Sequence, residues 1–413
     1  MEKNCLQCKS RFEITDEDLS FYENVSPIYS GKKHLIPPPT LCPDCRQQRR
    51  ISWRNERSLY SRRCSKTAKR IISMYSEDAI FPVYDNDVWW GDKWDPFEYG
   101  QDFDFNRPFF QQIKELHDKV PHFALAIAKT TMQNSDYCNH AGYLKDCYLI
   151  YNVDYDERCM YSKAVNRCFD CLDCFEVFDS EACYECMSTY NCKFCTYLRD
   201  SYNSNECHFS YNLTGCTKCF LCINLKNQEY CIKNEKYSPE DWQKEVDSMR
   251  AKYSNEELLN VLTEARANAV IKRINENNTE NCTGDYLANC KDCRACYDCE
   301  YLEKSTYCYD LKKGDGVSYE NYDISQFGVG VVQCYEGGTI GYDDNHCLFG
   351  ENVWGSFDVH YSMLCVNNCK NCFGCVGLKK AEYCIFNKQY TKAEYEETVA
   401  KIIEHMKKPR LAG

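Results

Sequence analysis

A cysteine recurs at every twelfth position over a long central part of the chain. The positions are Cys147, Cys159, Cys171, Cys183, Cys195, Cys207, Cys219 and Cys231. Two further columns keep the same step and hold only small or apolar residues. They are Cys138, Ile150, Ser162, Cys174, Cys186, Leu198, Ser210 and Cys222 in one column, and Cys168, Ser180, Cys192, Ser204 and Cys216 in the other. Residue size that repeats at a fixed step indicates positions facing a common interior.

A unit of twelve residues is too short for a helical repeat, which needs about 30 residues or more. The unit must instead form very short strands joined by tight corners, and successive coils then stack at about 4.8 Å. Cysteine is small and apolar, so it suits the narrow interior of such a coil. We therefore expect a mainly β fold built from a cysteine-rich β-solenoid. A coil of 24 residues with two equivalent halves remains an alternative.

The repeat module occurs twice. The segment from Cys216 to Ser238 matches the segment from Cys369 to Thr391 at 12 of 23 aligned positions. Each copy is followed by a helix start with a capping pattern, so each solenoid is expected to end in a helical cap that covers its exposed edge. The predicted domains are 1–70 (zinc ribbon and basic arm), 71–134 (aromatic, acidic connector with a short helix), 135–238 (first solenoid), 239–276 (helical cap and linker), 277–391 (second solenoid) and 392–413 (C-terminal cap).

Two Cys-x-x-Cys pairs open the chain, Cys5 with Cys8 and Cys42 with Cys45. Each pair offers two thiolates from one tight turn, and four thiolates form the tetrahedron that structural zinc prefers. The spacing therefore predicts one structural zinc ion. Redox-active or core cysteines are the alternative reading.

The N-terminal residues Cys5-Leu-Gln-Cys8, Phe12-Glu-Ile-Thr15, Phe21-Tyr22 and Cys42-Pro-Asp-Cys45-Arg46 resemble the probable zinc-ribbon domains of bacterial proteins. The resemblance covers about the first 50 residues. It implies a zinc ribbon or treble-clef fold with the four cysteines as ligands. The layout of the whole chain is similar to uncharacterised cysteine-rich repeat proteins of candidate-phylum bacteria, which implies no activity. The twelve-residue spacing also resembles the β-helix of insect antifreeze proteins, but the ice-binding Thr-x-Thr ladder is absent here.

A basic segment follows the second cysteine pair. It holds ten basic residues from Arg46 to Arg70 and a single acid, Glu56, in a chain whose net charge is −12. The run after Cys45 reads as a helix with arginine on several faces. Such an arm suits a polyanion, RNA or DNA, and the acidic body could equally neutralise it. The candidate nucleic-acid-binding residues are Arg46, Arg49, Arg50, Arg54, Arg57, Arg62 and Arg63.

No catalytic motif is found: the chain has no Gly-x-Ser-x-Gly, P-loop or dinucleotide fingerprint. We therefore predict a non-enzymatic adaptor, whose acidic and tyrosine-rich solenoid surface could bind a protein partner. The alternative is a store for soft metals such as Cu(I) or Zn(II), or a thiol redox protein. The repeat cysteines could be free, metal-bound or disulfide-linked. Because the sequence shows neither a signal-peptide pattern nor a long apolar stretch, we expect a cytoplasmic location without membrane contact.

Overall fold

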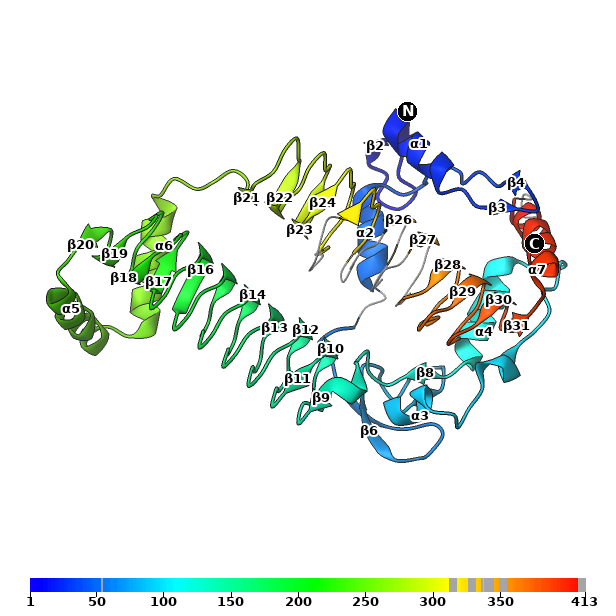
Figure 1. Cartoon of the computed structure of the whole chain (residues 1–413), viewed down its shortest axis with the longest axis horizontal. Helices are drawn as coiled ribbons and strands as arrows, with labels where there is room; N and C mark the ends of the chain where they lie inside the picture. Colours follow the sequence, from blue (N-terminus) through cyan, green and yellow to red (C-terminus); the bar gives the residue numbers. More distant parts are fainter. Residues whose placement is uncertain are drawn as a thin grey trace.

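The computed structural model describes residues 1–52, 55–311, 318–325, 332–335, 337, 345–348 and 355–407. The fold is strand-rich, with seven α-helices and one large, mostly parallel sheet among these residues. Figure 1 shows two stacks of short strands, with helices α5 and α6 at the far end of the first stack and the N-terminal elements beside the second.

The first stack is a series of coils joined by parallel pairing. Partners lie twelve residues apart, as in Lys163 with Phe175 and Cys219 with Cys231. The repeat of the structure is therefore twelve residues. Its strands are β9 (Met132–Gln133), β10 (Asn139–Gly142), β11 (Leu144–Lys145), β12 (Tyr151–Asp154), β13 (Lys163–Asn166), β14 (Phe175–Phe178), β15 (Met187–Tyr190), β16 (Thr196–Tyr202), β17 (His208–Tyr211), β18 (Thr217–Phe220), β19 (Glu229–Ile232) and β20 (Glu235–Lys236).

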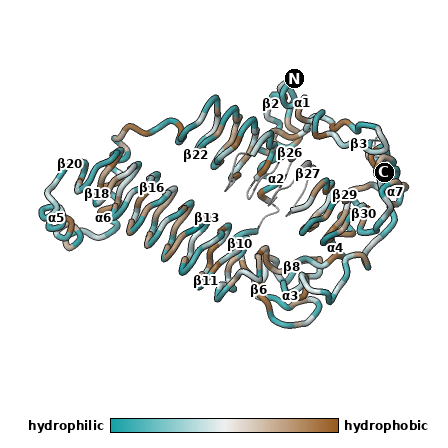
Figure 2. Tube along the Cα trace, viewed as in Figure 1, coloured by the Kyte–Doolittle hydropathy of each residue, from teal (hydrophilic) through white to brown (hydrophobic). Residues whose placement is uncertain are grey.

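Within each coil the backbone repeats every three residues. Every third residue from His140 to Lys233 has a positive φ, between 48° and 63°. From Ala141 to Cys222 the residue after each of these corners is buried, so these coils have four inward positions, one more than the sequence columns revealed. The additional column is Ala141, Val153, Val165, Val177, Thr189, Ser201 and Leu213, all buried. Figure 2 shows the resulting short alternation of hydrophobic and hydrophilic residues along the coils.

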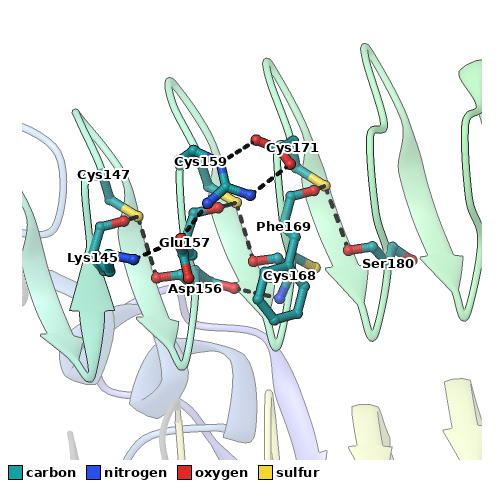
Figure 3. A network of polar contacts seen from close by, with 11 residues as sticks. Lys145, Cys147, Asp156, Glu157, Cys159, Cys168, Phe169, Cys171 and Ser180 are labelled. Carbon is teal, nitrogen blue, oxygen red and sulfur yellow. Dashed lines mark hydrogen bonds and ion pairs between the residues drawn. The ribbon is translucent and has the colours of Figure 1, made fainter.

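The interior of the stack is lined by thiols that also form hydrogen bonds. All eight cysteines of the first predicted column are at most 2% exposed. The Cys159 thiol lies 3.5 Å from the carbonyl oxygen of Cys168, and the Cys195 thiol lies 3.4 Å from that of Ser204 (Figure 3 shows the first of these). A serine can replace an inward cysteine: in the column of Cys168, the Ser180 hydroxyl donates to the carbonyl of Phe178 at 2.8 Å, as the Cys168 thiol does to that of Asn166. These thiols and hydroxyls therefore fill the core with their hydrogen atoms directed at carbonyl oxygens. The buried Thr189 hydroxyl is an exception, since it has no partner among the described residues.

The second stack repeats this arrangement with less regular steps. Cys372 pairs with Cys384, twelve residues on, whereas Val359 pairs with Cys372, thirteen residues on. Its strands are β21 (Glu276–Asn277), β22 (Gly284–Ala288), β23 (Cys296–Glu300), β24 (Leu302–Glu303), β25 (Ser318–Tyr319), β26 (Val332–Tyr335), β27 (Asn345–Leu348), β28 (Phe357–His360), β29 (Lys370–Phe373), β30 (Glu382–Ile385) and β31 (Lys388–Gln389). Hydrogen bonds from Asn152 to Asp310 and from Tyr286 to Asp200 join the two stacks.

Three helices follow the stacks. They are α5 (Pro239–Lys252), α6 (Asn255–Ala267) and α7 (Lys392–Met406). Ser238 caps α5, and Thr391 caps α7 through a full capping box, which confirms the two helix starts predicted from the sequence. Helix α5 lies on β19 and α7 on β30, so each stack is covered where its last strands turn back.

The N-terminal part is a set of small hairpins and helices. Its elements are β1 (Glu2–Asn4), β2 (Arg11–Glu13), α1 (Asp16–Asn24), β3 (Ile28–Tyr29), β4 (Lys32–Lys33), α2 (Pro43–Ser52), β5 (Tyr60–Arg63), β6 (Arg70–Ser73), β7 (Val83–Tyr84), α3 (Asn86–Trp90), η1 (Pro96–Tyr99), α4 (Phe109–Lys119), β8 (His122–Phe123) and η2 (Lys129–Thr131). The prediction of one helix through the basic segment is wrong in its extent. Helix α2 ends at Ser52, the Asn55 side chain closes a turn with Ser58, and residues 60–63 form a strand.

Candidate metal centre and basic surface

The four N-terminal cysteines form a compact cluster. Cys5 and Cys8 come from the turn between β1 and β2, while Cys42 and Cys45 flank the first residues of α2. Their sulfur atoms all lie within 4.8 Å of one another, and those of Cys8 and Cys42 are 3.7 Å apart. Four sulfurs bound to zinc at about 2.3 Å would be separated by about 3.8 Å. The cluster therefore has the size of a tetrahedral thiolate site and could hold a metal ion.

The surroundings of the cluster divide its thiols into two kinds. Burial raises the pKa of Cys5, but the N–H groups of Cys42, Cys8 and Gln7 outweigh it and lower this pKa to about 6. The hydroxyl and N–H of Ser10 lower the pKa of Cys8. Burial together with neighbouring thiols raises the pKa of Cys42, and raises that of Cys45 to about 12. A bound cation would allow all four thiols to be ionised together.

Three of the predicted nucleic-acid-binding arginines are buried and therefore not available to a polyanion. The Arg46 guanidinium pairs with Asp323 of the second stack, with its Nε 2.7 Å from one carboxylate oxygen. The Arg50 Nε donates to Ser325 at 2.8 Å, and Arg62 donates to the carbonyl of Ser76. A partly desolvated guanidinium needs a fixed partner, so Arg46 and Arg50 fasten α2 to the second stack.

The remaining predicted arginines have a different environment. Arg49, Arg57 and Arg63 are exposed, and Arg54 lies outside the described residues. Arg63 ends the first strand of the β5–β6 hairpin, whose turn carries Lys66 and Lys69, and Arg57 comes just before this hairpin in the chain. The exposed cations of this region form what we call the basic hairpin: Arg57, Arg63, Lys66, Lys69 and Arg70. None of these five forms an ion pair within the described part of the chain; Arg63 and Arg70 contact only the Ala68 carbonyl and the Ser61 hydroxyl.

The thiols of the stacks do not gather as the N-terminal ones do. In the described residues, the Cys5–Cys8–Cys42–Cys45 cluster is the one group of three or more metal-ligating side chains with mutually close ligand atoms. All cysteines whose side chains are described are free thiols. Stack thiols contact their neighbours along and across the columns, as Cys171 does with Cys159, Cys168, Cys174 and Cys183. No described set of three or more has all its sulfur atoms mutually close, so their geometry is that of packing groups.

A cavity that no sequence motif indicated lies where the first coil meets the connector. Its volume is about 820 Å³, and its walls include Trp90, Ile127, His140 and Asp154. Burial raises the pKa of Asp154 to about 7. These residues come from distant parts of the chain and share no spacing pattern, so tertiary structure alone brings them together.

No family model matches the chain, and no curated protein is significantly similar to it. None of the helices in the described ranges has both the length and the apolar character needed to cross a membrane.

Proposed function

We propose that this chain is a non-enzymatic interaction protein in which one structural zinc ion holds an N-terminal ribbon of the treble-clef type and two capped β-solenoids form a rigid body. The compact cluster of four thiols supports the zinc, because four sulfur ligands at this separation select soft or borderline metals over magnesium or calcium. The twelve-residue register and the inward thiols support the solenoids.

The basic hairpin is the proposed site for a polyanion, and RNA or DNA is the class that fits it. Five exposed cations without an acidic partner among the described residues, in an otherwise acidic chain, are the observation that carries this proposal. Cations neutralise phosphates without reading the base sequence. Binding is therefore expected to be salt-dependent and weakly selective for sequence.

A binding titration tests the hairpin. Fluorescence anisotropy with a labelled 20-nucleotide single strand and the matching duplex is measured between about 50 and 200 mM KCl. We compare wild type with Lys66→Glu/Lys69→Glu/Arg70→Glu. The matched control makes the same charge change at three exposed lysines at the far end of the first stack, Lys226→Glu/Lys233→Glu/Lys236→Glu.

The slope of log K against log salt is negative, and loss of three phosphate contacts should reduce its magnitude by about 2–3 for duplex DNA. The hairpin variant should show this loss and the control should keep most of the wild-type affinity. Absence of binding by wild type, or equal losses in both variants, contradicts the proposal.

A protein partner is proposed for an apolar stripe on the first stack. One column of the stack runs through Tyr148, Met160, Leu172 and Tyr184. It then passes the polar residues Thr196 and His208 and ends with Phe220 and Ile232. Helices α5 and α6 bury the last two of these, whereas Met160 is 39% exposed and Leu172 37%.

The residues that α5 and α6 place on the stack indicate the chemistry of the partner. Trp242 and Val246 of α5 and Leu258 and Leu262 of α6 are each spaced by four, which is one face of an amphipathic helix. The Arg266 guanidinium lies 4.1 Å from the centre of the Tyr211 ring. The stripe is therefore proposed to accept an amphipathic helix with basic flanking residues.

A peptide with the sequence of residues 254–269 serves as the probe. Fluorescence anisotropy should detect its binding to wild type, and Met160→Glu/Leu172→Glu should weaken it by about tenfold or more, because a carboxylate would be buried in an apolar contact. Tyr319→Glu, at an exposed tyrosine of the second stack, should leave the affinity unchanged. Equal binding by all three proteins contradicts the stripe.

Soft-metal storage is the less favoured function, because the stack thiols lie in columns and contact backbone carbonyls. Anaerobic purification followed by mass spectrometry should give one zinc ion per chain and free stack thiols. Several tightly held metal ions per chain would favour storage instead.

A further inference from the structure

Residues 60–90 repeat the backbone of the N-terminal cysteine unit. In the first unit, β1 and β2 pair Lys3 with Phe12 and Asn4 with Arg11. Fifty-nine residues later, β5 and β6 pair Arg62 with Ile71 and Arg63 with Arg70 in the same antiparallel register. The two hairpins therefore have turns of equal length, with Cys64 in the place of Cys5.

The two turns share their hydrogen bonds as well. In the first, the Cys5 N–H donates to Ser10 at 2.9 Å and the Lys9 N–H donates to Cys5 at 3.0 Å. In the second, the Cys64 N–H donates to Lys69 at 2.8 Å and the Ala68 N–H donates to Cys64 at 2.9 Å. Lys9 and Ala68 both have positive φ, 64° and 58°. Such a turn directs successive N–H groups at one sulfur.

The helical halves of the two units correspond with a different offset, of 43 residues. The Cys42 N–H donates to the Cys5 sulfur at 3.3 Å, and the Asp85 N–H donates to the Cys64 sulfur at 3.3 Å. Helix α2 begins directly after Cys42, and α3 begins directly after Asp85.

A further bond ties each turn to the strand or loop before its helix. The Leu6 N–H donates to the carbonyl of Thr40 at 3.0 Å, and the Ser65 N–H donates to that of Val83 at 2.8 Å. These pairs keep both offsets, 59 and 43 residues. A chance similarity of hairpins would not also preserve the contact between hairpin and helix.

The correspondence assigns four ligand positions in the second unit. They are Cys64, Thr67, Asp85 and Val88, in the places of Cys5, Cys8, Cys42 and Cys45. Burial follows the same order, since Cys64 and Val88 are 2% and 5% exposed whereas Thr67 and Cys8 are exposed. The second unit replaces the metal by apolar packing: Cys64 and Val88 belong to one core cluster that continues into the first stack.

We propose that residues 60–90 are a second, metal-free copy of the metal-binding unit, in which one of four ligands is retained and from which a zinc site can be restored. The copy carries four of the five cations of the basic hairpin, Arg63, Lys66, Lys69 and Arg70, so the fold of that part of the surface does not depend on a metal. The inference about the copy stands apart from the proposed polyanion binding, because it concerns only the backbone and the ligand positions.

The test is restoration of the site by Thr67→Cys/Asp85→Cys/Val88→Cys. Elemental analysis should give one zinc ion per wild-type chain and two per chain of the variant. Titration with Co²⁺ should show a second tetrahedral thiolate site by its visible absorption. Adding Cys64→Ser should return the count to one, and so should moving one cysteine by two residues in Thr67→Cys/Asp87→Cys/Val88→Cys.

A milder variant covers the case in which the triple variant does not fold. In Val88→Cys alone, the Cys64 sulfur and the thiol introduced in α3 should be close enough to form a disulfide with diamide, which peptide mapping detects as a cross-link. A folded triple variant that still binds one ion, or no cross-link in Val88→Cys, overturns the inference. A count of zero in wild type and one in the triple variant would keep the inference and refute zinc binding by the first unit.

Discussion

Asp156 is an acid inside the sulfur-lined core of the first stack, and Asp156→Ser should stabilise the protein. The side chain is 2% exposed, and one carboxylate oxygen accepts the Cys168 N–H at 2.8 Å (Figure 3). The other oxygen has no hydrogen-bond partner among the described residues. Ser180 lies in the same column two coils on, and its hydroxyl is fully hydrogen-bonded. It donates to the carbonyl of Phe178 and accepts the Cys192 N–H at 3.1 Å. Serine at position 156 should do the same.

The size and pH dependence of the effect follow from these contacts. A buried polar atom without a partner costs about 1–3 kcal/mol, and this is the gain in unfolding free energy expected for Asp156→Ser. Burial, and then the nearby thiols of Cys168 and Cys159, raise the pKa of Asp156 well above its ordinary value. A raised pKa in the folded state means that wild type is favoured below the unfolded pKa of about 4 and loses stability as pH rises through the folded pKa. The advantage of the serine variant should therefore be larger at pH 8 than at pH 5.

The local stability of the coils around Asp156 is measured by hydrogen exchange in zinc-containing buffer. Mass spectrometry follows the exchange in peptides from residues 144–171. Asp173→Asn is the control, because it removes an exposed acidic charge and keeps a residue that tolerates the positive φ of 54° found there. Protection should rise in Asp156→Ser and stay at the wild-type level in the control. Unchanged or weaker protection in Asp156→Ser at pH 8 would refute the account of Asp156 as an unsatisfied buried acid.

Three further outcomes are expected. Arg46→Ala should destabilise the contact between α2 and the second stack by about 1–3 kcal/mol, because the buried Asp323 loses its shorter ion pair and keeps only Arg50 at 3.5 Å; limited proteolysis should then cleave near residue 52 sooner than in wild type. Trp242→Ala should cost about 3–5 kcal/mol, since this ring is 4% exposed between α5 and the last coils, and chemical denaturation monitored by circular dichroism should detect a less stable first stack. Chelation of the metal at neutral pH should raise hydrogen exchange in residues 1–52 and leave residues 60–90 unchanged; equal loosening of both segments would contradict a metal-free second unit.

The periodic part of the fold was largely accessible from sequence. Inward positions tolerate few residue types, so Cys171, Cys183 and Cys195 repeat visibly and their step equals the pairing register. The fourth inward column was missed because Ala141, Val165 and similar residues share size but not identity. The corner residues were missed for the opposite reason: most of their side chains lie outside the core, so the positive φ at every third position leaves no strong preference beyond a scattering of Asn and Asp.

The candidate metal cluster was also predicted, because paired Cys-x-x-Cys motifs carry their geometry within a turn. Its second copy was invisible, since only Cys64 of the four ligand positions is retained. The cavity beside Asp154 could not be predicted either, because its walls come from separate segments that share no residue pattern.

Sequence by itself determined the repeat of the stacks, the capped helix starts and the four clustered cysteines, because each of these is set by residues that are near neighbours or that recur at a constant step. Tertiary structure alone decided which arginines remain available. Arg46 and Arg50 meet Asp323 and Ser325, more than 270 residues away along the chain, while the cations of the basic hairpin find no acid in the described part of the chain. Charge can be counted from a sequence, but its accessibility depends on which distant surface comes to lie against it.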